Sequence, residues 1–249
     1  MVPLKEDART IHITGDQARY LVTVLRCRVG DPLSLFDGKG TSYRARIAGI
    51  TRRDVVAEVL DAFRDDAESP LDLTLVQGLL RGEKMDFVIQ KTTELGISQI
   101  VPAITERSQI RETRKIARWR KIAEEAAEQC GRSIVPVIHD VIPYQDIFPS
   151  LPGASWPNKT TGLIFWEAGG AALPTRGRGR QVPPALTIAV GPEGGFTGEE
   201  IARAEAGGFS VVSLGKRILR AETAAIAATA LVQFSFGDLG GLMPPRKSG

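Results

Sequence analysis

The chain has 249 residues, of which 43% are hydrophobic and 24% are charged, and its net charge at pH 7 is +3. This is the composition of an ordinary globular protein, long enough for one large domain or two modest ones. No apolar run reaches the roughly 18 residues of a membrane span, and the first residues lack the apolar core of a signal peptide, so we expect a cytoplasmic protein. The few possible ligands, Cys27, Cys130, His12 and His139, indicate neither a disulfide framework nor a metal site.

Residues 1–70 are predicted to form a separate unit made mostly of short strands. Strands are expected at 10–14, 33–36, 42–48 and 54–60, and an amphipathic helix at 16–25. Closely spaced short strands with little helix indicate a small barrel. Arg44 and Arg46 fall on one face of their strand, because side chains alternate along a strand. That face is either ordinary solvent-exposed surface or a surface that contacts phosphates.

The acidic, polar segment 61–70 ends in proline and is predicted to be a linker. Beyond it, alternating strands and helices indicate a mostly parallel sheet in an α/β fold over 71–238. Strands are expected at 71–79, 97–104, 134–138, 161–166, 186–190 and 209–213, and helices at 84–95, 112–129 and 221–236. A further helix is expected to begin after Thr197, whose spacing to Glu200 matches a capping box.

Two basic stretches are candidates for contact with an anionic partner. Seven basic residues and a single acid lie between Arg107 and Lys121. This run is either a solvated helix face or, because so few acids accompany it, a surface for an anion. The arginines of 176–180 lie in a loop over 168–184 that is rich in glycine and proline. We interpret that loop as a disordered insertion, with RNA contact as the alternative.

Two glycine-rich loops that follow predicted strands mark a candidate ligand site. The first, 191–198, has the sequence GPEGGFTG, and the second, 214–223, has the sequence LGKRILRAET. Ligands of open α/β sheets bind at the carboxyl ends of strands, and glycine lets backbone N–H groups approach a ligand closely. The alternative is a pair of ordinary strand-to-helix turns. Neither loop matches the P-loop or the dinucleotide-binding fingerprint, so we expect a different cofactor.

These two loops also resemble the signature of a known family. Together with 20–26, 35–38, 82–96 and 126–132, they resemble the RsmE family, bacterial 16S ribosomal RNA uridine N3-methyltransferases of the SPOUT superfamily. The resemblance spans most of the chain, and the pair of loop motifs is quite specific. It implies a PUA-like RNA-binding barrel over 1–70. It also implies a trefoil-knotted SPOUT domain over 71–249 that binds S-adenosylmethionine and pairs into a homodimer.

The expected cofactor site combines the two loops with the end of a preceding strand. Leu214, Ile218 and Leu219 are expected to form apolar walls for an adenine. Glu193 either binds a ribose or caps the neighbouring backbone. The full predicted set is Phe165, Trp166, Gly191, Glu193, Gly194, Gly195, Leu214, Gly215, Arg217, Ile218, Leu219, Arg220, Thr223 and Ala224.

Methylation at uridine N3 requires that the base lose its N3 proton or that the developing anion be stabilised. Arg220 is predicted to stabilise negative charge on the base carbonyls, as an oxyanion hole does. Glu222 or Glu94 is the candidate proton acceptor. For each glutamate, an ion pair with a neighbouring basic residue is an equally good interpretation.

The resemblance implies 16S rRNA as the partner, within the small ribosomal subunit. RNA contacts are predicted for Arg26, Arg44, Arg46, Lys84, Lys91, Arg111, Arg114, Arg118 and Arg132. One alternative is another SPOUT reaction, such as ribose 2′-O-methylation. The other is a non-catalytic RNA-binding protein of ribosome assembly.

Overall fold

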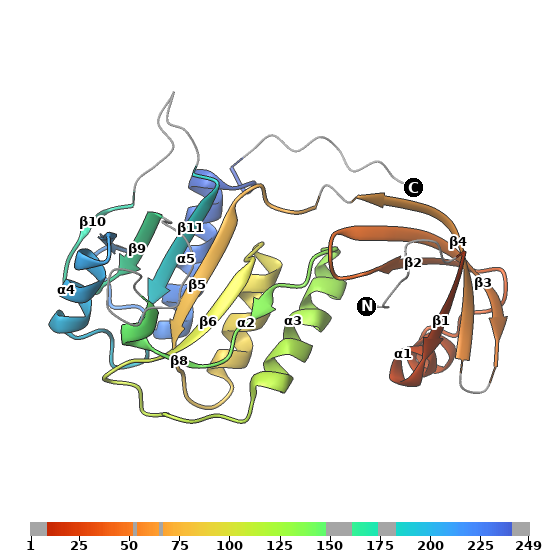
Figure 1. Ribbon diagram of the computed structural model, residues 1–249, viewed down its shortest axis with the longest axis horizontal. Coiled ribbons are helices and arrows are strands. Elements are labelled where there is room, and N and C mark those ends of the chain that lie inside the picture. The colour runs from red at the N-terminus through yellow and green to blue at the C-terminus, as the bar shows by residue number, and fades with distance from the viewer. Residues whose placement is uncertain (1–8, 52–53, 65–66, 148–160, 174–182, 241–249) are drawn as a thin grey trace. The chain divides into compact units, whose positions relative to one another are not determined.

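A computed structural model describes residues 9–51, 54–64, 67–147, 161–173 and 183–240 (Figure 1). The chain separates into two compact units, one of residues 1–68 with 127–135 and the other of residues 69–126 with 136–249. No helix in the described part of the chain is long and apolar enough to cross a membrane. The arginines of 176–180 lie outside the described residues, so the structure does not bear on their predicted setting.

The first unit is built on a four-stranded antiparallel sheet with the strand order β1-β4-β3-β2. Its strands are β1 (Thr10–Thr14), β2 (Pro32–Phe36), β3 (Thr41–Ile50) and β4 (Asp54–Arg64). The helix predicted at 16–25 is present as a short α1 (Gly15–Arg19) that continues as a π-helix, η1 (Tyr20–Val24). A small apolar core lies between the sheet and these helices and contains Ile11, Ile13, Ala18, Leu21, Ala45, Ile47, Val55 and Ala57.

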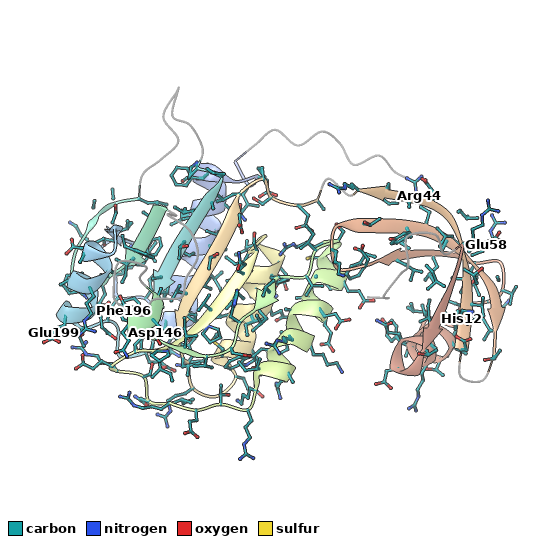
Figure 2. The ribbon with its side chains drawn as sticks, in the orientation of Figure 1. His12, Arg44, Glu58, Asp146, Phe196 and Glu199 are labelled. Atoms are coloured by element: carbon teal, nitrogen blue, oxygen red, sulfur yellow. The ribbon has the colours of Figure 1, made fainter. Side chains whose placement is uncertain are left out.

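The linker predicted at 61–70 begins too early, because β4 continues to Arg64. The backbone of 61–64 pairs with β3, where Arg44 stands opposite Asp61. Arg44 Nη1 lies 3.7 Å from Asp61 Oδ2, and the Arg44 guanidinium lies 5.0 Å from the centre of the Phe63 ring. Figure 2 labels Arg44 on this sheet. An acidic stretch that looks like a solvated linker in sequence is therefore paired with a cation from the neighbouring strand.

The second unit is an α/β fold around a parallel sheet. The strand order is β10-β12-β9-β11-β5-β6-β7, with β8 also paired to β6, and each of these pairs is parallel. The strands are β5 (Asp72–Gly78), β6 (Gln99–Ile104), β7 (Val137–Ile138), β8 (Ile142–Pro143), β9 (Thr161–Phe165), β10 (Ala171–Ala172), β11 (Ala185–Val190) and β12 (Phe209–Ser213). The two-residue strands β8 and β10 were not predicted, because so short a segment shows no periodicity.

Helices cover this sheet, as the near-continuous apolar runs of its strands require. They are α2 (Lys84–Glu94), α3 (Ile116–Cys130), α4 (Gly198–Ala206) and α5 (Ala221–Phe236), with a 3-10 helix η2 (Tyr144–Ile147). Helix α5 packs on α2 and lies over β5 and β11 (Figure 1). The sheet face that carries Val76, Ile164 and Ala189 packs against η2 and α4.

Helix α4 begins where the sequence predicts it. Thr197 Oγ1 accepts the backbone N–H of Glu200, and Glu200 Oε2 accepts the backbone N–H of Thr197. The predicted capping box is therefore confirmed. Phe196, just before the cap, is buried against Tyr144, with the two ring centres 5.3 Å apart. Figure 2 labels Phe196 and Glu199 at this end of α4. This packing fixes the exit of the first glycine loop.

Candidate functional site

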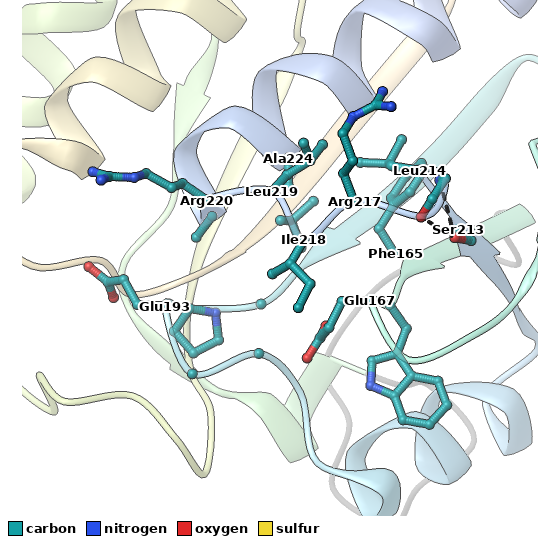
Figure 3. Close-up of a pocket in the computed structure, with 18 of the residues that line it drawn as sticks. Phe165, Glu167, Glu193, Ser213, Leu214, Arg217, Ile218, Leu219, Arg220 and Ala224 are labelled. Atoms are coloured by element: carbon teal, nitrogen blue, oxygen red, sulfur yellow. Dashed lines mark hydrogen bonds between the residues drawn. The ribbon is translucent and has the colours of Figure 1, made fainter.

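A cavity of about 460 Å³ lies in the second unit, where the parallel strands β9, β11 and β12 end (Figure 3). The segments that follow each strand line it: Trp166 and Glu167 after β9, the first glycine loop after β11, and the second after β12. Lys84, at the start of α2, completes the wall. Its volume falls in the range of small-molecule pockets, roughly 300–1,000 Å³.

All the residues predicted around a cofactor line this cavity except Thr223, which is exposed on the first turn of α5. The structure therefore brings together residues from three separate strand ends. The lining residues absent from the predicted cofactor set are Lys84, Glu167, Val190, Pro192, Ser213 and Ala221. Glu167 follows the strand that ends at Phe165, so the rule of strand carboxyl ends alone would have identified it. In Figure 3 its carboxylate points toward Ile218.

Two glycines of the first loop are needed for different structural reasons. Gly195 has a φ of +69°, a left-handed conformation that other residues adopt at a cost, and a Cβ there would collide with the carboxylate of Glu167. At Gly194 a Cβ would lie 2.9 Å from Arg107 Cβ. Arg107 Nη1 in turn donates a hydrogen bond of 2.9 Å to the Gly194 carbonyl. Arg107, predicted only as part of a basic run, therefore braces the loop.

Lys84 joins two acidic side chains at the cavity wall. Its Nζ lies 3.1 Å from Glu193 Oε1 and 3.8 Å from Glu222 Oε2. Burial acts to raise the pKa of Glu193, but hydrogen bonds from the Arg81 backbone, from its own backbone and from Lys84 outweigh burial and lower it. The Oε2 atoms of Glu193 and Glu222 are both buried without a hydrogen bond to any described residue.

The other two predicted catalytic residues lie in contrasting places. Arg220 lines the cavity and occupies the N-cap position of α5. Glu94 is not brought to the cavity: it ends α2, ten residues from Lys84, which is roughly 15 Å along a helix. Its Oε1 lies 2.7 Å from Lys91 Nζ, so an ion pair accounts for both Glu94 and the predicted RNA contact Lys91.

The basic run 107–121 is compensated by acids from elsewhere in the fold. Arg118 Nη2 lies 2.7 Å from Asp86 Oδ2, and Arg120 Nη2 lies 2.9 Å from Asp140 Oδ1. The sequence shows only one acid within the run, because these partners are distant in the chain. The run is therefore less positive in the folded protein than its composition indicates.

Arg132 is a buried structural residue of the first unit, with 6% of its surface exposed. Its guanidinium donates to Glu68 Oε2 through Nε at 3.0 Å and Nη2 at 2.8 Å. This setting does not present Arg132 to RNA. The predicted RNA contacts that are exposed at the surface are Arg26, Arg44, Arg46, Arg111, Arg114 and Arg118.

Two protein-family models match the chain. One, described as an RNA methyltransferase domain, matches residues 67–233, and the other, an RNA methyltransferase PUA domain, matches residues 13–60. The chain belongs to this RNA methyltransferase family. The ribosomal RNA small subunit methyltransferase E of Synechocystis is 34% identical, covering 90% of this chain and 72% of its own. That of Bacillus subtilis is 31% identical, covering 92% of this chain and 91% of its own.

A solved structure of a family member is similar over nearly the whole chain. The ribosomal RNA small subunit methyltransferase E of Neisseria gonorrhoeae, bound to S-adenosylmethionine, has a TM-score of 0.85 and 37% identity, covering 96% of this chain and 97% of that one. The predicted α/β fold, a SPOUT-type methyltransferase domain preceded by a PUA-type domain, is confirmed. The predicted enzyme class and cofactor are confirmed at the level of the family.

The residues that line the cavity of this chain fit such a cofactor. Apolar walls surround a space of adequate volume, and the acidic residues Glu167 and Glu193 also line it. A ligand with an aromatic base, hydroxyl groups and positive charge matches this combination. Among the described residues, no group of three or more His, Cys, Asp or Glu side chains is placed to hold a metal ion.

Proposed function

We propose that this protein transfers the methyl group of S-adenosylmethionine to N3 of a uridine in 16S rRNA of the small ribosomal subunit. The observation that carries the proposal is the cavity at the ends of β9, β11 and β12, in a chain of the RNA methyltransferase family. Relatives named for small-subunit ribosomal RNA support the substrate class. The choice of uridine N3 rests on the resemblance of the two glycine loops to the RsmE signature.

The cofactor would be held by apolar walls and by two carboxylates. Leu214, Ile218 and Leu219 line one side of the cavity, and Ile218 is 84% exposed, in position to cover a planar base. Glu167 and Glu193 line the cavity and are suited to accept hydrogen bonds from ribose hydroxyls. When bound, S-adenosylmethionine supplies an electrophilic methyl group on a positively charged sulfur.

The protein's own part in the reaction is to position the base and to stabilise charge on it. Arg220 places a permanent positive charge at the cavity, suited to the uracil oxygens when N3 gives up its proton. The N-terminus of α5, a helix of 16 residues, begins beside it and adds the positive end of the helix dipole. Both features favour the anionic form of the base over the neutral one.

RNA binding is proposed for each unit separately. We assign the RNA-binding role to a domain over 1–70, with Arg26, Arg44 and Arg46, and catalysis to a domain over 71–249. In the second, Arg111, Arg114 and Arg118 are the candidates for phosphate contact, whereas the predicted contact Lys84 is paired with Glu193 and Glu222. Arginine and lysine neutralise phosphates without reading sequence, so these contacts would set affinity rather than select the uridine.

A trefoil knot and a homodimer belong to the same proposal. β12 lies beyond β9 in the sheet, yet α5, which follows it in the chain, lies over β5 and β11. The second glycine loop thus leads the chain back across the strand ends, the kind of crossing that a knot requires. Exposed Leu231 and Phe234 on α5 support a surface for a second copy of the chain. A ribosomal substrate supports a cytoplasmic location.

Calorimetry with S-adenosylmethionine and the full-length protein tests the enzyme assignment directly. We expect saturable binding, whereas no binding at millimolar ligand would favour the non-catalytic RNA-binding alternative. Methyl transfer to naked 16S rRNA, to the small subunit and to a partly assembled particle, assayed in parallel, identifies the true substrate.

A further inference from the structure

Two carboxylates and one ammonium meet where α2, the first glycine loop and α5 converge. Lys84 and Glu193 line the cavity, and Glu222, which is not itself a lining residue, approaches Lys84 from the first turn of α5. The side chain of Lys84 is 36% exposed, that of Glu193 20% and that of Glu222 15%. The two carboxylates are largely shielded from water, so their pairing with Lys84 matters more than a fully exposed ion pair would.

The two carboxylates are held very differently. Glu193 Oε1 accepts hydrogen bonds from the Arg81 backbone and from Lys84, each 3.1 Å long. Glu222 has only the longer ion pair with Lys84, at 3.8 Å, and its buried Oε2 accepts no hydrogen bond from the described residues. The buried Oε2 of Glu193 also lacks a donor among the described residues, so the two carboxylates differ in the hydrogen bonds to Glu193 Oε1. Glu193 is therefore fixed as an anchor by two hydrogen bonds, whereas Glu222, held by the ion pair alone, is freer to meet a substrate.

The position of Glu222 suits a base. It lies on the first turn of α5, two residues after Arg220, which lines the cavity. The N-terminus of α5 and the ammonium of Lys84 both lie close to this carboxylate. Glu222 is thus placed as a candidate proton acceptor near the arginine suited to an anionic base.

We propose, on the premise of the proposed function, that Glu222 accepts the N3 proton of the uracil and that Lys84, anchored by Glu193, is its positioning residue. In this step the N3–H bond breaks and an O–H bond forms on Glu222. The electron pair of the broken bond stays on N3 and is shared with the two uracil carbonyl oxygens, next to Arg220. Proton transfer leaves N3 as the nucleophile.

The first test compares Glu222→Gln with Glu205→Gln, the same change at an exposed glutamate of α4 outside the cavity. The full-length protein, S-adenosylmethionine with a labelled methyl group and small ribosomal subunits lacking this modification are mixed, and single-turnover rates are measured across pH. We expect Glu222→Gln to slow methylation by about a hundredfold or more, with unchanged S-adenosylmethionine affinity. The loss should shrink as pH rises, because hydroxide then removes the N3 proton. Glu205→Gln should match the parent.

The second test separates positioning by Lys84 from simple support of the fold. Lys84→Met removes the charge and Lys84→Arg retains it. We expect Lys84→Met to move the acidic limb of the pH–rate profile to higher pH, because two carboxylates then lack the cation they share. Lys84→Arg should keep the acidic limb of the pH–rate profile near its position in the parent protein. The other charged groups of the cavity wall, Glu167, Arg217 and Arg220, are unchanged in every variant.

The inference is overturned if Glu222→Gln methylates at the rate of the parent protein. It is also overturned if Lys84→Met lowers the methylation rate by the same factor at every pH. Either result leaves the proposed function intact. Loss of S-adenosylmethionine binding in Glu222→Gln also overturns it, because Glu222 would then belong to the cofactor site. If the parent protein places no methyl group on uridine N3, the proposed function itself fails, and the inference fails with it.

Discussion

Single residues of the first glycine loop show why a glycine-rich motif is more than a flexible turn. The sequence predicts that these glycines let backbone N–H groups approach a ligand. The structure adds a separate reason at two positions: Gly194 accommodates Arg107, and Gly195 adopts a positive φ next to Glu167. Neither partner is near the loop in sequence, so only the folded protein reveals these constraints.

Gly195→Ala is expected to weaken S-adenosylmethionine binding while the protein stays folded. A left-handed conformation costs an L-residue about 1–2 kcal/mol, which corresponds to about a tenfold loss of affinity if the loop shifts to relieve it. Gly198→Ala is the matched control on the same loop, since its Cβ would meet no atom within 4 Å. Calorimetry on both variants checks the prediction, and parental affinity in a folded Gly195→Ala protein would remove this glycine from the site.

Glu193 should make stability depend on pH in the acid range. Because its pKa in the folded protein lies below its ordinary value of 4.5, its charged form stabilises the fold above pH 4.5. That contribution is lost as the pH falls through the folded pKa. Urea unfolding of the parent should therefore show a steeper loss of stability on acidification than Glu193→Gln. Parallel pH dependences in the two proteins would contradict the assignment.

At the scale of the element, helix starts and buried strands are the features that local sequence predicts well. The capping box of Thr197 and Glu200 lies within four residues, and its donors and acceptors pair as the spacing requires. Where partners come from distant segments, local reasoning fails. The segment 61–70 resembles a linker in sequence, but its first residues pair with β3. Arg132 resembles an RNA contact in sequence, but Glu68 binds it in the interior.

Thr197→Ala should destabilise the second unit by about 1 kcal/mol, the usual cost of losing a helix N-cap. In the variant the Glu200 N–H loses its acceptor, Thr197 Oγ1, and the 3.1 Å hydrogen bond that Oγ1 donates to Glu106 Oε2 is lost as well. Urea unfolding measures the change. Ser210→Ala, an exposed position on β12, is the control and should be nearly neutral. Equal stability of the two variants would show that the cap contributes nothing.

At the scale of the whole molecule, alternating strands and helices predict the parallel sheet and the edge where a ligand binds, but not the strand order. That order brings the ends of β9, β11 and β12 together, although other elements separate them in the chain. Lys84 enters the cavity wall for the same reason. The charge cluster of Lys84 with Glu193 joins residues 109 positions apart, beyond the reach of any local motif.

The basic face of the first unit gives a prediction about RNA affinity. If Arg44 and Arg46 bind phosphates, the double variant with alanine at both positions should bind RNA more weakly. The slope of the logarithm of its RNA-binding constant against the logarithm of salt concentration should be shallower by about one unit for each phosphate that the variant no longer neutralises. Filter binding at several salt concentrations measures this, with unchanged S-adenosylmethionine binding as the control. A parental salt slope would leave Arg44 with its structural role beside Asp61 and Phe63 alone.

The central claim, methylation of uridine N3, is tested most directly by identifying the modified nucleoside. Small ribosomal subunits that lack the modification are incubated with the protein and S-adenosylmethionine, and their 16S rRNA is digested and examined by mass spectrometry. We predict that 3-methyluridine appears at a single position, in an amount that saturates at one methyl group per subunit. A methyl group on a ribose 2′-oxygen instead, or no new methyl group on the RNA, would contradict the account.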